Sequence, residues 1–315
     1  LGISKHGELF MRLKRKEPLL VQSGLVLGLL AMGNLIGRFS QVLRYLLAGL
    51  ALFFLINLVI GIVTNFKQAQ KQLKDPLIAS VFPTFFMQGM VSSTYVATWS
   101  FLGESALLIA QGLWWLSFIG LIALMAYYLF SFVFPFKWDN VYPAWTVLFV
   151  GIGVAPLTIA VSQQFVLGQV IFWYGLVATI FVLPLVFYKT YKIGLVDTVR
   201  PNTTTICAPI SLMTAAYTTT FSHPNSLILL LLLISGQILY LFILCQIFRL
   251  FKRPFSAGFS AFTFPLVISA TALGSSLTVF QLGLFGYIWF LCEVAIALIA
   301  TLLVTGLYLK DIFEK

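Results

Sequence analysis

The sequence predicts an all-α polytopic membrane protein with ten transmembrane helices. The composition is 60% hydrophobic and only 9% charged over 315 residues, and the mean hydropathy is +1.02. A soluble domain carries about 25% charged residues, whereas each helix that crosses a bilayer needs about 20 mostly apolar residues. The apolar runs are long and continuous rather than alternating, so helices are expected instead of a β-barrel.

The ten predicted spans divide the chain into three parts. A cytoplasmic N-terminal segment over 1–18 precedes a transmembrane domain over 19–309, and a cytoplasmic tail occupies 310–315. The spans are expected at 19–36, 41–66, 76–98, 104–134, 141–162, 163–189, 202–221, 225–251, 256–280 and 283–309.

The basic residues predict the orientation of these spans. If the N-terminus is cytoplasmic, Arg38 and Arg44 are the only basic residues in outer loops, which leaves 17 of the 19 Lys and Arg residues (19 − 2) on the cytoplasmic side. Cytoplasmic loops of membrane proteins carry such an excess. We therefore expect a multi-pass protein of the plasma membrane with both termini cytoplasmic. The net charge of +10 then needs no nucleic-acid partner.

The odd-numbered spans begin at residues 19, 76, 141, 202 and 256, at intervals of 57, 65, 61 and 54 residues. This period predicts one helical hairpin repeated five times. Ser and Thr number 26 in the 108 residues of the odd spans but only 9 in the 138 residues of the even spans. Polar groups in a bilayer turn toward protein or water, so odd spans are expected to be inner helices and even spans outer ones.

Four odd spans carry a proline near mid-depth, within "SVFPTFF", "GVAPLTI", "CAPISLM" and "FTFPLVI". Proline removes a backbone donor and kinks a helix. One such proline is common in spanning helices, but recurrence at corresponding places predicts five kinked inner helices around an axial path. The expected kinks are at Gly24, Pro83, Pro156, Pro209 and Pro265.

Two local motifs extend this pattern: "SGLVLGLLAMGNL" in the first span and "AFTFPLVISATA" in the ninth. With the five hairpins, they make the chain resemble the tellurite-resistance/dicarboxylate transporter (TehA-like) family, which is related to the slow anion channels of plant guard cells. The resemblance implies a homotrimer with one pore per subunit. Val26 stands where family members often have proline, so the first helix is expected to bend less.

The resemblance also implies a pore-occluding phenylalanine just before the kink of the ninth span, which maps onto Phe262. Helical spacing from Phe262 places Leu266, Ser269 and Ser276 on one stripe, as candidate pore-lining residues. The chain has 31 phenylalanines, most of which must be packing residues. The rival candidates for the gate are Phe255, Phe259 and Phe264.

The inner spans carry no acidic side chain, and no Lys, Arg or His lies in their middle. We therefore expect a neutral pore that favours weakly hydrated monovalent anions. Proline kinks expose carbonyls, which favour cations, so anion preference is assigned to the basic cytoplasmic loops.

Catalysis needs clustered His, Asp or Glu, and the inner spans lack them. No enzyme activity, cofactor or metal site is predicted.

Glu293, in "WFLCEVAIALI", is the acidic residue deep in a span. It either hydrogen-bonds a neighbouring helix or subunit, or couples transport to protons.

The leading function is a passive channel for small inorganic or organic anions, in contact with membrane lipid. The alternative is a carrier or exporter of C4-dicarboxylates or other anions, coupled to protons and associated with tellurite resistance. Carriers often show inverted repeats, which are not obvious here, so the channel is favoured.

Overall fold

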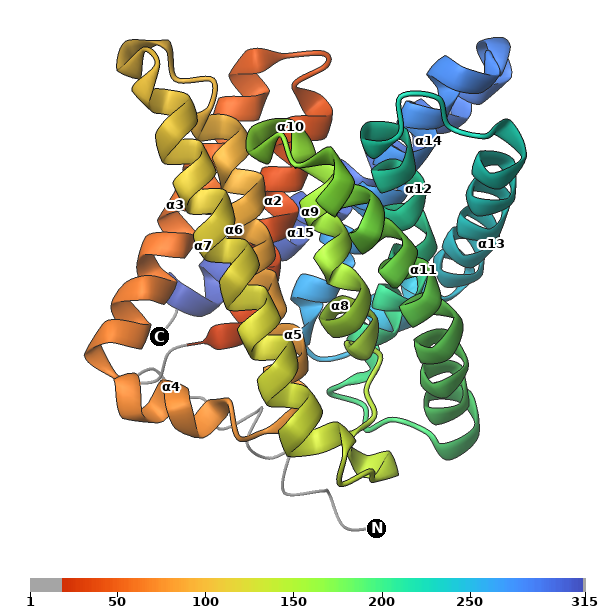
Figure 1. Cartoon of the computed structure of the whole chain (residues 1–315). Coiled ribbons are helices and arrows are strands. Elements are labelled where there is room, and N and C mark those ends of the chain that lie inside the picture. Colours follow the sequence, from red (N-terminus) through yellow and green to blue (C-terminus); the bar gives the residue numbers. More distant parts are fainter. Residues whose placement is uncertain (1–18, 314–315) are drawn as a thin grey trace.

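The computed structural model describes residues 19–313, and every regular element within that range is a helix (Figure 1). The predicted N-terminal segment, 1–18, and the last two residues of the predicted tail, 314–315, lie outside the described residues. Within the described range, six helices are long and apolar enough to cross a membrane. The chain is therefore an all-helical membrane protein with several apolar helices.

Five of the six long helices coincide with the even-numbered predicted spans, and we call them the long helices. They are α3 (Gln41–Thr64), α7 (Ser105–Tyr128) with its continuation η3 (Leu129–Val133), α11 (Phe165–Tyr188) with its continuation η6 (Lys189–Ile193), α13 (Ser226–Phe251) and α15 (Gly283–Phe313).

The odd-numbered predicted spans consist of shorter pieces, which we call the five broken stretches. In chain order they are η1 (Leu20–Gln22) with α2 (Ser23–Ile36); α5 (Pro76–Val81) with α6 (Pro83–Val96); α8 (Trp145–Val150), η5 (Gly151–Gly153), α9 (Val154–Leu157) and α10 (Ile159–Ser162); η7 (Arg200–Cys207) with α12 (Ala208–Thr220); and η8 (Ala257–Phe262) with α14 (Phe264–Phe280). The fifth stretch supplies the sixth long apolar segment, and the other four have no single helix of that length. Three short helices, α4 (Phe66–Gln72), η2 (Ser100–Leu102) and η4 (Trp138–Asn140), lie in connections.

Helix breaks lie at or beside all four prolines of the broken stretches. Pro83 begins α6, Pro209 and Pro265 are the second residues of α12 and α14, and Pro156 lies in the one-turn helix α9. Proline fits the first turn of a helix, where its missing N–H would have no partner. Tight 3-10 turns precede α9, α12 and α14, so these three stretches change from 3-10 to α-helical geometry beside their prolines.

The first stretch departs from the expected kink at Gly24. Its 3-10 turn ends at Gln22, and Gly24 lies inside the continuous helix α2. A Cβ added to Gly24 would lie 2.9 Å from the Oγ atom of Ser260. Gly24 therefore allows α2 to approach η8 closely rather than bending α2.

The broken stretches contact one another in chain order, and the last contacts the first: α2 with α6, α6 with α9, α9 with α12, α12 with α14, and α14 with α2. Side-chain hydrogen bonds cross four of these seams. Ser23 and Thr84 share a bond of 2.6 Å, Thr219 donates to the Pro156 carbonyl over 3.0 Å, Ser211 and Ser269 share one of 3.1 Å, and Thr263 donates to the Gly24 carbonyl over 3.2 Å.

Each long helix packs against the broken stretch that precedes it in the chain: α3 on α2, α7 on α6, α11 on α8, α13 on α12 and α15 on α14. The most apolar windows of the long helices are only 22–44% buried, against 72% for the window in Ala257–Phe280. The outward faces of the long helices are therefore strongly apolar and suited to lipid.

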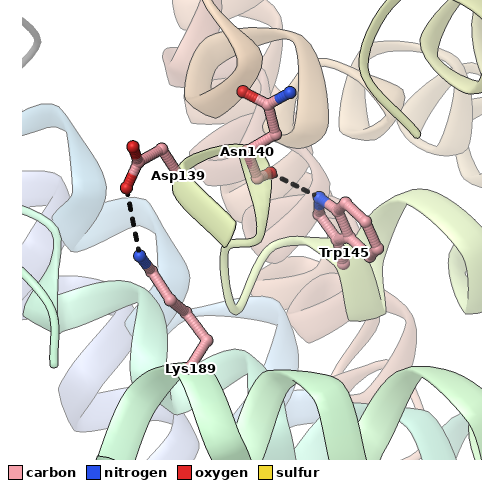
Figure 2. A network of polar contacts seen from close by, with 4 residues as sticks. All are labelled: Asp139, Asn140, Trp145 and Lys189. Carbon is pink, nitrogen blue, oxygen red and sulfur yellow. Dashed lines mark hydrogen bonds and ion pairs between the residues drawn. The ribbon is translucent and has the colours of Figure 1, made fainter. Parts of the chain in front are cut away.

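Polar contacts tie the connections at the end of the molecule that carries most of the basic residues. Lys189 is buried, and its Nζ atom lies 3.8 Å from a carboxylate oxygen of Asp139 (Figure 2). Beside this pair, the indole of Trp145 donates to the backbone carbonyl of Asn140 over 2.8 Å. These contacts hold η4 between the end of α11 and the start of α8.

Candidate functional site

Two cavities lie between the broken stretches. The first has a volume of about 30 Å³ and is lined by residues from all five stretches: Gly24, Val81, Thr84, Val147, Asn202, Thr205, Ser260, Ala261, Phe264 and Pro265. The second has a volume of about 160 Å³ and is lined by Ala31, Asn34, Leu35, Arg38, Val91, Thr94, Leu157, Thr158, Phe264, Ile268 and Thr271.

The order of the lining residues follows the direction of the chain. In four of the five stretches, earlier residues line the first cavity and later residues line the second, as in Gly24 before Asn34 and Thr84 before Thr94. These stretches therefore run past the two cavities in the same direction.

Phe264 is the one residue that lines both cavities. It is the first residue of α14, directly before Pro265, and only 5% of its surface is exposed. The preceding Thr263 anchors this turn, because its hydroxyl lies within hydrogen-bond distance of the carbonyls of Ser260, at 2.7 Å, and Gly24, at 3.2 Å. Phe264 thus lies at the boundary between the two cavities.

Phe262, the residue expected to close the pore, lines neither cavity. Its side chain is fully buried, and its ring stacks on Phe251 of α13 with centroids 4.0 Å apart. The ring of Phe259 meets it edge-on at 5.3 Å. The ring of Phe262 therefore packs toward a long helix and away from both cavities, a position that does not favour it as the gate.

The expected pore-lining stripe of the ninth span also differs from the residues that line the cavities. Leu266, Ser269 and Ser276 are buried and line neither cavity, whereas the lining residues of α14 are Phe264, Pro265, Ile268 and Thr271. The expectation counted α-helical turns from residue 262, which lies in the 3-10 helix η8. Thr263, with φ −92° and ψ −86°, interrupts the α-helical repeat and changes which face meets the cavities.

The prolines differ in their relation to the cavities. Pro265 lines the first cavity, whereas Pro83, Pro156 and Pro209 are absent from both linings. The Pro156 carbonyl accepts hydrogen bonds from Thr219 over 3.0 Å and from Thr220 over 3.3 Å. Hydroxyl groups of the next stretch therefore satisfy a carbonyl beside this break.

Arg38 is the one charged residue among those that line the two cavities. It lies in the connection between α2 and α3, and its side chain is exposed at the open end of the second cavity. Contact with the protein partly desolvates the guanidinium and lowers the pKa of Arg38 from its ordinary value. The remaining lining is uncharged.

Glu293 lies outside both cavities, on α15, and is 2% exposed. The indole N–H of Trp289 lies 3.0 Å from Oε1 of Glu293 and 3.0 Å from the side-chain carbonyl of Gln237 on α13. The second carboxyl oxygen of Glu293 is buried and has no hydrogen-bond partner within the part of the chain that the structure describes. Trp289 thus links α15 to α13 behind the broken stretches, and Glu293 accepts from the same indole on its own helix.

Sequence reasoning ranked one residue of this site too low and gave two others no role in it. Phe264, directly before the kink proline, was only a rival candidate for the gate, because the resemblance was mapped onto Phe262. Asn34 and Arg38 were read only as a span residue and a loop charge. The available signal for Arg38 was its position, just past the end of an inner span and on the side with few basic residues.

No curated protein matches this chain. A family model with the description voltage-dependent anion channel matches residues 22–308, which include all the lining residues of both cavities. The match extends over most of the chain, from the 3-10 turn before α2 to the last turns of α15. The chain therefore belongs to the voltage-dependent anion channel family.

Proposed function

We propose that the protein is a passive anion channel whose conduction path passes through the two cavities and is closed by Phe264. The observation that carries this proposal is that one aromatic residue, Phe264, lines two otherwise separate cavities. A bulky apolar side chain in a narrow path excludes ions sterically and by dewetting.

The architecture that supports this path is ten spans arranged as five hairpins. The broken stretches form the inner members and the long helices the outer ones, in keeping with the closed cycle of contacts among the broken stretches. Two of the breaks border this path directly, because the 3-10 turns η7 and η8 line the first cavity with Asn202, Thr205, Ser260 and Ala261.

The anion preference has two local supports besides family membership. The Asn202 side chain lines the first cavity, and its amide nitrogen is buried without a hydrogen-bond partner within the described residues. An N–H group stabilises an anion rather than a cation. Neither cavity has an acidic lining residue, so a dehydrating anion meets no repulsive charge.

The uncharged first cavity also favours particular anions. An ion that enters about 30 Å³ must lose most of its water, since one water needs roughly 10–15 Å³ of such space and the cavity holds only a few waters. Weakly hydrated monovalent anions lose water at the smallest cost, so chloride, bromide and nitrate are expected to pass more easily than sulfate.

A proton-coupled carrier of dicarboxylates or other anions is the second candidate, and Glu293 is the observation that favours it. A buried carboxyl group with one unpartnered oxygen is a reasonable proton carrier. The position of Glu293 behind the cavities weighs against this, because a coupling group usually lies on the path of the substrate. A role in tellurite export remains part of this second candidate.

The location and assembly that accompany the proposal rest on charge and resemblance. The excess of Lys and Arg on the connections that follow the long helices supports cytoplasmic termini in a plasma membrane. The family resemblance supports a homotrimer with one path per subunit.

Chloride flux from liposomes tests the proposal. We expect the wild-type protein to be nearly silent and Phe264→Ala to raise chloride flux at least about tenfold, the change that a barrier of about 1.4 kcal/mol imposes. Phe264→Leu retains bulk and should give an intermediate rise. A folded Phe264→Ala protein without increased flux would exclude this residue as the gate.

A further inference from the structure

We infer that the second cavity holds a binding site for one small monovalent anion, formed by Arg38 and Asn34 at its open end. The site lies before Phe264 on the path from the α2–α3 connection. The inference rests on the proposed channel function. In it, Arg38 is the charged residue that captures the anion before the anion reaches the constriction at Phe264.

The position of Arg38 is the first observation. A Cβ added to Gly274 would lie 3.1 Å from Nη1 of Arg38, so the guanidinium rests against the backbone of α14. The neighbouring Phe39 stacks on Phe290 of α15 with centroids 6.2 Å apart. The connection is thereby held against α14 and α15, with the Arg38 side chain across the cavity opening.

The lack of a protein counter-charge is the second observation. Within residues 19–313, the Arg38 side chain makes no ion pair and no hydrogen bond, and none of the residues that line this cavity is acidic. A guanidinium has five N–H donors in a planar fork and stays protonated. Its full charge and donor set are therefore available to a ligand.

The second basic residue on this side provides a contrast. The Arg44 guanidinium lies over the ring of Tyr95, 4.6 Å from its centroid, and is within 3.4 Å of the Gln41 side-chain oxygen. Arg44 does not line the second cavity. Arg38 is thus the basic group placed to receive an ion there.

The hydrogen bonds of the cavity wall restrict where an anion can lie. The hydroxyl groups of Thr94, Thr158 and Thr271 donate to the carbonyls of Val91, Val154 and Val267 in their own stretches. They can therefore offer only lone pairs to a ligand. Asn34 donates to Thr94 over 3.0 Å and keeps one amide hydrogen, which leaves Asn34 and Arg38 as the donors.

The size and charge of the site indicate the class of anion. A volume of about 160 Å³ accommodates a halide or nitrate together with a few waters. One guanidinium neutralises one negative charge, and none of the other residues that line this cavity is a cation that could balance the second charge of a dicarboxylate or sulfate. A monovalent inorganic anion that keeps part of its hydration shell is the ligand that fits.

Planar-bilayer recordings in the Phe264→Ala background test the site. From the side of the α2–α3 connection, Arg38→Gln should raise the half-saturating chloride concentration about tenfold, because it removes a charge at contact distance. Arg38→Lys should remain close to the parent. Arg44→Gln, the matched control, should change it less than about twofold, because the Arg44 guanidinium lies over the Tyr95 ring and does not line the cavity.

The inference is overturned if Arg38→Gln leaves chloride saturation unchanged, if Arg44→Gln has the same effect, or if sulfate or succinate saturates at lower concentration than chloride.

A second measurement separates this inference from the channel proposal. Crystals of the wild-type protein soaked in bromide should show an anomalous peak beside Arg38, and crystals of Arg38→Gln should not. If Phe264→Ala passes no anion current but the bromide peak appears, the channel proposal fails and the site stands. If current flows and no peak appears at Arg38, the site is rejected alone.

Discussion

The stretch Ala257–Phe280 is less apolar than the five long helices, yet it is more deeply buried. The mean hydropathy of the stretch is 1.5 and its window is 72% buried, whereas the long helices have values of 2.1–2.8 and are 22–44% buried. In water the more apolar helix would be the buried one. In a bilayer the lipid receives the most apolar surface, so hydroxylated and small residues mark the helices that pack inside.

Two glycines, one from each region, illustrate this contrast. A Cβ on Gly28 of α2 would collide with the Thr263 side chain and lie 3.1 Å from the backbone nitrogen of Phe264. A Cβ on Gly306 of α15 would meet nothing within 4 Å. The same residue type therefore sets a close helix approach in a broken stretch and occupies open surface on a long helix.

Thiol labelling provides the largest expected difference between the regions. In a cysteine-free Phe264→Ala background, Thr271→Cys should react readily with a water-soluble thiol reagent, because residue 271 lines the second cavity. Ser276→Cys, on the same helix but buried away from both cavities, should stay unreacted. Equal reaction at Leu303→Cys, on the outward face of α15, would contradict the division into inner and outer helices.

Phe262 and Phe264, on either side of Thr263, allow a packing residue and a cavity-lining residue to be compared within one stretch. Phe262→Ala should lower the free energy of unfolding by about 3–5 kcal/mol, because it removes a fully buried ring from its contact with Phe251. It should leave chloride flux at the wild-type level, in contrast to Phe264→Ala. Denaturation in detergent, paired with liposome flux, makes the measurement. An open, stable Phe262→Ala protein would return the gate to Phe262.

The glycine contrast predicts a smaller effect. Gly28→Ala should destabilise the fold by about 1–3 kcal/mol, because the added methyl group overpacks the seam between α2 and α14. Gly306→Ala, the matched control, should be neutral or stabilise by up to about 1 kcal/mol through helix propensity. Thermal unfolding of the two variants decides this, and similar losses in both would show that the close approach is unimportant.

Glu293→Gln should have the smallest effect. Glutamine keeps the oxygen that accepts from Trp289, so the link between α15 and α13 should persist and the unfolding free energy should change by less than about 1 kcal/mol. Anion flux measured across a pH series should keep the wild-type profile. Loss of proton-linked uptake in this variant would instead favour the carrier.

The amino-acid sequence by itself determined the membrane class and the alternation of two kinds of segment. Composition and run length decide between water and lipid as the solvent, and the five long helices coincide with the even predicted spans because their apolar runs are uninterrupted. Prolines predicted breaks in the odd spans because the lost backbone donor acts locally. The prediction was wrong at Gly24, since a glycine permits a bend without requiring one.

Only the tertiary structure decided which side chains meet in the site. Phe262 and Phe264 are equivalent by composition and nearly equivalent by spacing, and the 3-10 helix η8 with Thr263 sets which ring faces the cavities. Arg38 and Asn34 join Thr94 and Thr271 from distant parts of the chain only when the stretches pack together. Helix breaks and the preference of a segment for lipid or protein depend on local sequence. The direction in which a side chain points depends on how its helix is rotated against its neighbours, and no single segment of the sequence determines that rotation.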